Sequence, residues 1–457
     1  MEFTVPQPYL EDASGFSGSA ERLFLPESDE AVARILREAS AAGVPVTVAG
    51  AGTGLTGGRV PQGGWVLSTE KLRLLEIHGG HALAGAGVAL RDLQAAAAAS
   101  GQRYPPDPTE WTASVGGTIA TNASGSRSFR CGATRRWVNG LTVALMDGTI
   151  RHFRRGEKID FPVSAIPAPD TTKNTAGYAL APGMDWMDLF IGSEGTLGVV
   201  THASLTLVPV PRSLITGVVF FESDPLAVAA VDQWRLVPGT QMLEYFDRGS
   251  LLMLRSAFPE IPETAFAAVL CEAELGSRTS EASEGWLDRL DAAGADVEAS
   301  WFAVSDQDRE RFRRIRHALP GLVNDMVRRN GFTKLGSDYA VPIGRNLEML
   351  GRYRKRLDAE FEGQYVIFGH IGDAHLHVNI LPASQREFDR GQEVMIELAR
   401  EAVALGGTVS AEHGLGKRKK ALLDIQYPRE AIEAMIAVKR RLDPHMLLGR
   451  GNLFSVV

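Results

Sequence analysis

Apolar residues recur every three or four positions between residues 29 and 42, which is the spacing of one face of an α-helix. Glu27 and Ser28 precede this stretch and Gly43 follows it, so the helix is expected to begin and end there. The same pattern predicts helices over residues 90–100, 308–319 and 388–405. Because helices and strands alternate without a repeat period, we expect a mixed α+β architecture. Short apolar runs predict the strands, over residues 44–48, 65–68, 82–87, 214–221, 268–274, 366–370 and 375–381.

Residues 49–58, which follow the first of these strands, are glycine and small residues with one leucine. Gly52, Gly54 and Gly57 match the GxGxxG spacing of a nicotinamide dinucleotide fold, but that fold needs a helix to start at the loop. Residues 59–64 contain Pro61 and two glycines and cannot start a regular helix, so this interpretation fails. Successive small residues still expose backbone N–H groups that bind phosphate oxygens. We therefore interpret the loop as a pyrophosphate cradle of another fold.

Composition narrows the class of protein. The chain has 457 residues, too many for one ordinary core, and a formal net charge of −7, which argues against a nucleic-acid binder. Its 48 glycines exceed the typical share of about 7% and suit close approach to a large cofactor. Two cysteines without a CxxC pattern give no disulfide framework. With no signal segment and no run of roughly 20 apolar residues, a cytoplasmic location is expected, and peripheral contact with a membrane stays open.

The regular pattern stops at Val208-Pro209-Val210-Pro211, because two prolines so close together break both a helix and a strand ladder. We place a domain boundary there. The sequence therefore predicts one domain over residues 1–211 and a second over residues 212–457.

Four of the ten histidines fall in two short stretches, His370 to Asn379 and Ala411 to Gly416. Three of them, His370, His375 and His377, lie within eight residues, and the fourth follows a glutamate directly. Imidazole and carboxylate groups suit zinc, and also manganese or iron, with an open position left for substrate. We expect a divalent-metal site here. Whether His375 is a ligand stays open.

Several sequence blocks occur in an order that resembles a known family. The glycine loop is followed by Tyr104-Pro105-Pro106-Asp107-Pro108-Thr109, by residues 114–123 and by residues 188–198. Together they resemble the FAD-binding domain of the vanillyl-alcohol oxidase and p-cresol methylhydroxylase type. The C-terminal half resembles the FAD-linked oxidase domain of D-lactate, glycolate and D-2-hydroxyglutarate dehydrogenases. The resemblance implies two domains of these types, with the last ~40 residues returning to the FAD domain.

The resemblance also implies FAD bound without a covalent link, because no histidine lies in the glycine loop. Ala49 stands where the family often has an arginine, and residues 449–451 replace its usual asparagine-proline-glycine. The positions that match the family's FAD contacts are Gly50, Ala51, Gly52, Thr53, Gly54, Leu55, Pro106, Asp107, Thr109, Gly116, Gly117, Ala120, Thr121, Asn122, Ser124, Gly125, Glu194, Gly195, Gly198, Val200 and Asn452.

The resemblance assigns roles to the histidine and glutamate cluster as well. In related dehydrogenases the positions of His370, His377 and Glu412 hold the metal, and the position of His413 is the catalytic base. Substrate-contacting positions are expected as well. Arg316 matches the arginine that binds the substrate carboxylate, and Arg313 and Arg314 stay open for the same role. Asn379 matches a further residue that contacts substrate. Lys334 is the nearest candidate for the family's substrate lysine, whose own position is Gly336. Gly336, together with Pro320 in place of a threonine, weakens the case for hydroxyglutarate itself.

The expected function is FAD-dependent oxidation of a D-2-hydroxy acid to the 2-keto acid, with hydride transfer to flavin N5. Three alternatives stay open: a metal-independent flavin oxidase of another alcohol, a metal-dependent hydrolase, and a non-catalytic flavin electron carrier. The expected partners are the hydroxy acid and an electron acceptor such as a quinone, a cytochrome or an electron-transfer flavoprotein. The sequence leaves open which acid is used and whether a homodimer forms.

Overall fold

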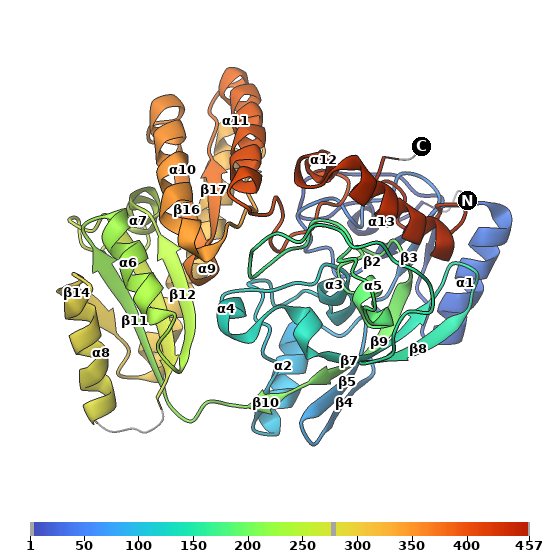
Figure 1. Cartoon of the computed structure of the whole chain (residues 1–457), viewed down its shortest axis with the longest axis horizontal. Helices are drawn as coiled ribbons and strands as arrows, with labels where there is room; N and C mark the ends of the chain where they lie inside the picture. The colour runs from blue at the N-terminus through green and yellow to red at the C-terminus, as the bar shows by residue number, and fades with distance from the viewer. Residues whose placement is uncertain (1–3, 276–279, 456–457) are drawn as a thin grey trace.

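The computed structural model describes residues 4–275 and 280–455, and Figure 1 shows two lobes. The first lobe contains the N-terminal elements and, from the far end of the chain, α12 and α13. The second lobe contains the elements from β11 to α11. The chain passes between the lobes after β10 and returns before α12, so both termini lie in the first lobe.

The first lobe is built on two main sheets. One is parallel with the strand order β1-β3-β2, and the other is antiparallel with the order β4-β5-β9-β7-β8. The strands are β1 (Arg22–Phe24), β2 (Val46–Ala49), β3 (Trp65–Ser68), β4 (Leu75–His78), β5 (His81–Gly85), β7 (Val138–Ala144), β8 (Ile150–Arg154) and β9 (Val199–Thr206). The helices are α1 (Asp29–Ala42), α2 (Leu90–Ala99), α3 (Val115–Ala120), α4 (Ser128–Cys131), α5 (Trp186–Phe190), α12 (Leu423–Gln426) and α13 (Arg429–Leu442).

Helix α1 has the bounds that the hydrophobic pattern predicts. The Ser28 hydroxyl accepts a hydrogen bond from the Ala31 N–H at 3.2 Å, which satisfies one free donor of the first turn. Gly43 ends the helix at a φ of 65°, a conformation that glycine adopts at little cost. Val32 and Leu36 are buried on its inner face. Strand β3 is likewise confirmed at its predicted bounds.

The second lobe is a seven-stranded antiparallel sheet with the order β14-β11-β13-β12-β16-β17-β15. Its strands are β11 (Leu214–Phe221), β12 (Thr240–Phe246), β13 (Ala267–Glu274), β14 (Asp296–Phe302), β15 (Leu335–Gly336), β16 (Tyr365–His370) and β17 (His375–Ile380). Its helices are α6 (Asp224–Trp234), α7 (Arg248–Leu254), α8 (Ser280–Ala292), α9 (Asp306–Asn330), α10 (Asn346–Glu360) and α11 (Gln385–Ala404). The mixed α+β architecture is therefore confirmed.

In two places the structure continues a helix or a strand through a proline where the sequence predicted that the element ends. Helix α9 continues eleven residues past Leu319, through Pro320, because its buried positions continue to Val323 and Val327 on one face. Pro320 removes only one intrahelical hydrogen bond, and that apolar face outweighs the loss. Residues Val208–Pro209 form a short strand, β10, paired with β6 (Gln102–Arg103). A two-residue edge pair tolerates a proline where a central strand would not.

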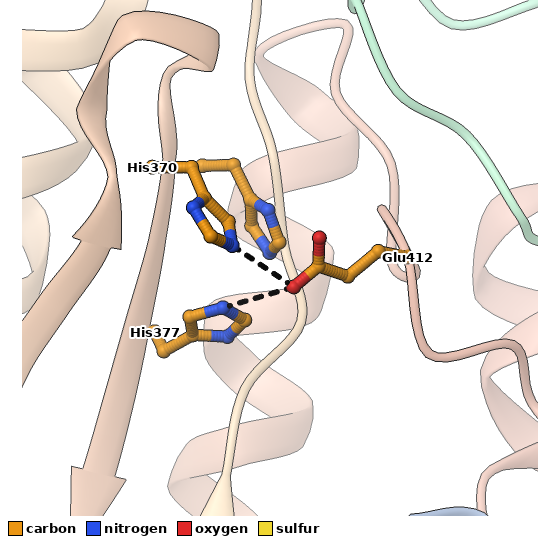
Figure 2. A group of neighbouring side chains, drawn as sticks. His370, His377 and Glu412 are labelled. Carbon is orange, nitrogen blue, oxygen red and sulfur yellow. Dashed lines mark hydrogen bonds and ion pairs between the residues drawn. The ribbon is translucent and has the colours of Figure 1, made fainter. Parts of the chain in front are cut away.

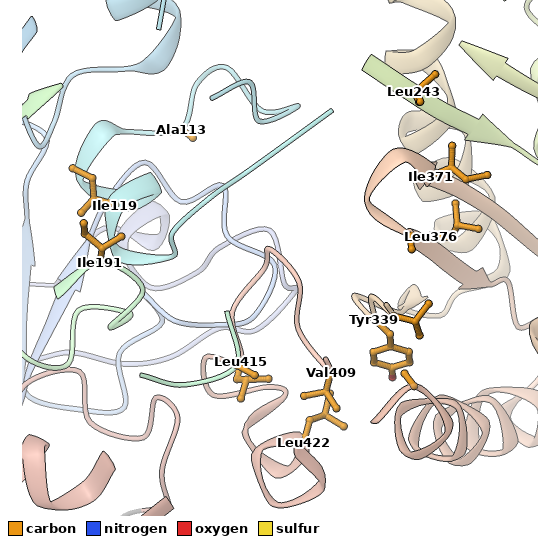
Figure 3. Close-up of a cluster of buried hydrophobic side chains, with 14 of the residues drawn as sticks. Ala113, Ile119, Ile191, Leu243, Tyr339, Ile371, Leu376, Val409, Leu415 and Leu422 are labelled. Atoms are coloured by element: carbon orange, nitrogen blue, oxygen red, sulfur yellow. The ribbon is translucent and has the colours of Figure 1, made fainter. Parts of the chain in front are cut away.

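One hydrophobic core includes buried residues from both lobes, such as Ile119 and Ile191 of the first and Ile371 and Leu376 of the second. Figure 3 shows the segment that carries Leu415 running between these two groups. The end of the chain is also anchored in the first lobe, because Leu448 forms a parallel bridge with Val46. Among the described residues, no helix is both long and apolar enough to cross a membrane.

Candidate functional site

The hairpin of β16 and β17 places three histidines on one face. His370 pairs with His375 across the hairpin, and His377 lies two residues further along β17 on the same face as His375. The turn between the strands is tight, with Ala374 at a φ of 50°. Gly369 lies so close to His377 that a Cβ atom there would stand 2.8 Å from the His377 ring. The local backbone therefore brings the imidazoles together.

Glu412 meets this hairpin from the segment that returns to the first lobe. Figure 2 shows His370 and His377 pointing at its carboxylate. Their Nε2 atoms lie 3.1 Å and 3.4 Å from Oε1 of Glu412. The other oxygen, Oε2, accepts hydrogen bonds from the Ser124 hydroxyl at 3.0 Å and from the Lys173 ammonium at 3.1 Å. Although burial opposes ionisation, Lys173 and His370 hold the pKa of Glu412 well below its usual range.

Hydrogen bonds orient the two imidazoles toward Glu412. The Nδ1–H of His377 donates to the backbone carbonyl of Ser337 at 3.1 Å, because a carbonyl oxygen can only accept. The Nδ1–H of His370 donates to Glu244 at 2.5 Å. Each ring thus presents its Nε2 atom to the same carboxylate. Ligand atoms from His370, His375, His377 and Glu412 all lie within 4.8 Å of one another.

This donor set fits a divalent cation. Two imidazole nitrogens and a carboxylate oxygen are ligands that zinc and related metals accept. Burial alone would lower the pKa of His370, but the carboxylates of Glu244 and Glu412 raise it to about 9. A metal ion would replace that proton and balance the same carboxylates.

His413 stands beside the cluster and is oriented by Asp338. The Asp338 carboxylate accepts the His413 backbone N–H at 2.8 Å and the Ser410 hydroxyl at 2.7 Å, and its Oδ1 lies 3.5 Å from His413 Nδ1. The other ring nitrogen of His413 lies 3.8 Å from Oε1 of Glu412. Burial lowers the pKa of His413 to about 4, against the pull of Asp338. The imidazole is therefore neutral near pH 7 and able to accept a proton.

His375 is fully buried between two charged groups. Its Nδ1 lies 3.4 Å from the Lys173 ammonium, which can only donate, and its Nε2 lies 3.1 Å from Asp338. Burial lowers the pKa of His375 to about 3, and the nearby His377 adds to this effect. The ring therefore connects Lys173 with Asp338.

The three expected substrate contacts surround the cluster. Arg316 is buried and donates through Nε to Glu244 at 3.0 Å and through Nη2 to Thr109 of the first lobe at 2.9 Å. Asn379 lies on β17, and a Cβ atom at Gly336 would stand 3.3 Å from its amide oxygen and 3.6 Å from the Lys334 side chain. Burial, with Lys419 and Arg418 nearby, lowers the pKa of Lys334 to about 8.

The expected FAD-binding tracts converge at the end of β2. A Cβ atom at Gly50 would stand 2.8 Å from Ser114 Oγ, so the first loop lies against the start of α3. Gly195 packs against Val48 of β2, at 3.6 Å for its Cβ position. No helix follows the first loop, as expected from residues 59–64. The structure thus brings three distant small-residue segments to one place.

The remaining expected positions lie around this point. Pro106, Asp107 and Thr109 are on the loop before α3, and Asp107 accepts a hydrogen bond from Arg127 at 2.6 Å. Gly116, Gly117 and Ala120 are in α3, and Val200 is in β9. The other members of the set lie in the loops that adjoin these elements, at Ala51, Gly52, Thr53, Gly54, Leu55, Thr121, Asn122, Ser124, Gly125 and Gly198.

The C-terminal segment completes this region. Asn452 donates to the carbonyl of Gly58 at 2.9 Å and to that of Glu194 at 3.0 Å. The Lys417 ammonium donates to Asn452 Oδ1 at 2.7 Å and to the Gly58 carbonyl at 3.1 Å. The buried Lys417 ammonium therefore connects the C-terminal segment around Asn452 with the glycine loop.

Sequence reasoning missed four charged residues of the site: Glu244, Lys173, Asp338 as an orienting group, and Lys417. Lys173 lies in a long segment without helix or strand, where an isolated lysine gives no pattern. The sequence does indicate Glu244, because it is the one charged residue in the strand Thr240–Phe246, all of which is buried. A single carboxylate in such a strand needs buried partners.

Comparison with known proteins identifies the family. The family model described as "FAD linked oxidases, C-terminal domain" matches residues 210–453, and the one described as "FAD binding domain" matches residues 20–154. The chain belongs to the FAD-linked oxidases. It is thus an FAD-linked oxidoreductase of the group that includes the glycolate, D-lactate and D-2-hydroxyglutarate enzymes.

Individual relatives cover nearly the whole chain. The glycolate oxidase subunit GlcD of Bacillus subtilis is 31% identical over 96% of this chain and 90% of its own length. The D-lactate dehydrogenase of Archaeoglobus fulgidus is 31% identical over 94% and 90%, respectively. The D-2-hydroxyglutarate dehydrogenase of Xanthomonas citri pv. viticola is 31% identical over 94% and 88%. A solved alkyldihydroxyacetonephosphate synthase shares the fold, with a TM-score of 0.68, 16% identity, and coverage of 93% of this chain and 75% of that one.

Proposed function

We propose that this FAD-linked oxidoreductase is a dehydrogenase of a D-2-hydroxy acid that uses a divalent metal, zinc in the first instance. The observation that carries the proposal is the convergence of His370, His377 and Glu412 beside a neutral, oriented His413. Relatives named for glycolate, D-lactate and D-2-hydroxyglutarate support the substrate class. The matches to residues 20–154 and 210–453 support a boundary at residues 211 and 212. The position of α12 and α13 in the first lobe, with the bridge between Leu448 and Val46, supports a return of the last ~40 residues to the FAD domain.

In this proposal His370, His377 and Glu412 hold the metal, and the glycine tracts with Asn452 hold FAD without a covalent link. Bound FAD supplies a hydride acceptor at N5, and a bound divalent cation makes a coordinated hydroxyl more acidic. The chain's own residues bind and orient the acid and remove its proton. The proposed partners are the hydroxy acid and an electron acceptor such as a quinone, a cytochrome or an electron-transfer flavoprotein.

Arg316 would bind the substrate carboxylate, because a guanidinium can donate two parallel hydrogen bonds to its oxygens. Lys334 and Asn379, on the other side of the histidines, would contact the rest of the acid. His413 would take the hydroxyl proton at Nε2, the nitrogen that faces Glu412, while Asp338 stabilises the ring after it is protonated. The C2 hydrogen would leave as hydride, which yields the 2-keto acid.

Dye-linked oxidation assays test the proposal. Lactate and 2-hydroxyglutarate are supplied as separate D- and L-enantiomers, with glycolate alongside, before and after removal of metal by a chelator. We expect one acid to be oxidised, D-selectively where it is chiral, with activity lost on chelation and restored by zinc, manganese or iron. His413→Gln should keep FAD and lose about 10²- to 10⁴-fold in turnover. Activity that survives complete metal removal would contradict the metal's role, and unchanged turnover in His413→Gln would contradict the base.

A further inference from the structure

Glu244 is a buried carboxylate in the middle of the second lobe's sheet. Its strand, β12, lies between β13 and β16, and every residue of that strand is buried. An ionised carboxylate in such a place is costly unless donors replace the water it has lost. Its position on a central strand also fixes its backbone, so its side chain offers a rigid point of attachment.

Two donors meet this carboxylate, one on each oxygen. The Nδ1–H of His370 donates to Oε1 at 2.5 Å, and the Nε–H of Arg316 donates to Oε2 at 3.0 Å. These two donors replace the water that the buried carboxylate has lost, one at each oxygen. One side chain therefore holds both a proposed metal ligand and the proposed substrate-binding arginine.

Both partners reach beyond Glu244 with their other nitrogen atoms. His370 Nε2 points to Glu412 at 3.1 Å, as Figure 2 shows. Arg316 uses Nη2 to reach Thr109 at 2.9 Å, and within the described residues no hydrogen bond involves its Nη1. Glu244 thus contacts the Nδ1 side of the His370 ring, away from Glu412, and the Nε side of the Arg316 guanidinium.

We propose that Glu244 is a positioning residue that fixes His370 in the tautomer that binds metal and holds Arg316 in one orientation, so that both are fixed relative to one another. The proposal rests on the proposed function. A carboxylate behind a metal-binding histidine makes its imidazole a stronger ligand and orients the ring. Here the same carboxylate also aligns the group that would receive the substrate.

Only an ionised carboxylate can serve both donors. A glutamine at this position offers one oxygen acceptor, and its amide NH₂ would face an N–H of either His370 or Arg316. One donor would then oppose another donor in a buried place, which is costly. Glu244→Gln therefore keeps the size of the side chain and removes the proposed property.

Glu272 provides a matched control. It lies on the neighbouring strand β13, is buried, and pairs with Arg127 of the first lobe at 2.8 Å. Like Glu244, it is a carboxylate bound to an arginine where the two lobes meet. Within the described residues, Glu272 has no hydrogen bond to His370 or Arg316. Glu272→Gln therefore measures how zinc affinity responds to the loss of a buried carboxylate charge that does not contact His370.

The test measures the zinc dissociation constant of the FAD-loaded full chain by competition with a chelating dye. Glu244→Gln should raise this constant by about 10- to 100-fold, whereas Glu272→Gln should leave it unchanged. Arg316→Met should lose turnover but retain zinc affinity, because Glu244 still holds His370. This variant keeps the proposal testable if Glu244→Gln fails to fold.

Unchanged zinc affinity in Glu244→Gln, or an equal loss in Glu272→Gln, would overturn the role of Glu244. An equal loss in Arg316→Met would also overturn it, because the effect would then come from disturbance of the interface. Failure of the unaltered protein to bind zinc, manganese or iron would instead contradict the metal in the proposed function, and with it this assignment. The two failures are therefore distinguishable.

Discussion

Glu194 connects the two halves of the candidate site and should make stability depend on pH. Its side chain is buried, and its two oxygens accept the backbone N–H groups of Leu415 at 2.8 Å and Gly416 at 2.6 Å, shortly after Glu412. Burial raises the pKa of Glu194 to about 7, although these hydrogen bonds and the nearby Lys417 oppose the shift. The carboxyl group is thus held where loss of its proton costs free energy.

The sign follows from the raised pKa. The folded protein holds this proton more tightly than the unfolded chain, so the contribution to stability is full below the ordinary value of 4.5 and is lost as pH rises through about 7. With these two values, the loss between a pH of about 5.5 and a pH of about 8.5 is roughly 2 kcal/mol.

Glu194→Gln removes this titration and keeps the shape of the side chain. It also leaves one of the two N–H donors without an acceptor, a cost of about 1–3 kcal/mol that does not vary with pH. The stability advantage of the unaltered protein over the variant should therefore shrink by roughly 2 kcal/mol over this pH interval. Urea unfolding followed by tryptophan fluorescence, with FAD in excess at both pH values, measures the difference.

A surface carboxylate serves as the control. Glu348 is exposed and its pKa is lowered by hydrogen bonds from Arg352 and Arg345, so Glu348→Gln should show no loss of the advantage with rising pH. A difference between the unaltered protein and Glu194→Gln that is constant with pH, or that grows as pH rises, would contradict the raised pKa of Glu194.

Two further predictions concern the FAD-binding region. Gly125→Ala should lower the free energy of unfolding by about 3 kcal/mol or more, because a Cβ atom there would lie 1.9 Å from the backbone oxygen of Asp107. The control Gly43→Ala, at a φ of 65° with open space around the new Cβ atom, should lower it by only about 1 kcal/mol. Unfolding midpoints compare the pair, and equal costs would contradict the packing argument. Lys417→Met should raise the FAD dissociation constant about tenfold, measured by flavin fluorescence on titration, because the ammonium no longer ties Asn452 to the glycine loop. Unchanged FAD affinity would show that this tie does not shape the cradle.

The sequence predicted elements wherever one local pattern decided the outcome. Helix α1 has a clear apolar face, a serine cap and a glycine stop, and its bounds were predicted correctly. Helix α9 was predicted too short, because packing of Val323 and Val327 outweighs the local effect of Pro320. Tertiary contacts, which the local pattern does not contain, decide such cases.

The same distinction explains the candidate site. The histidines were found because a hairpin brings them together within eight residues. Glu244 and Lys173 reach the cluster from strands and loops more than a hundred residues away in the chain, and no local spacing relates them to it. Their roles depend on which segments pack together, and that requires the structure.

The proposed function is tested most directly by the visible spectrum of the purified, FAD-loaded protein without oxygen, recorded before and after addition of glycolate and of single D- and L-2-hydroxy acids. We predict that one acid, the D-enantiomer where the acid is chiral, bleaches the flavin, and that prior removal of metal by a chelator prevents the bleaching. A flavin that none of these acids reduces would contradict the proposed substrate class and leave only the family and the fold.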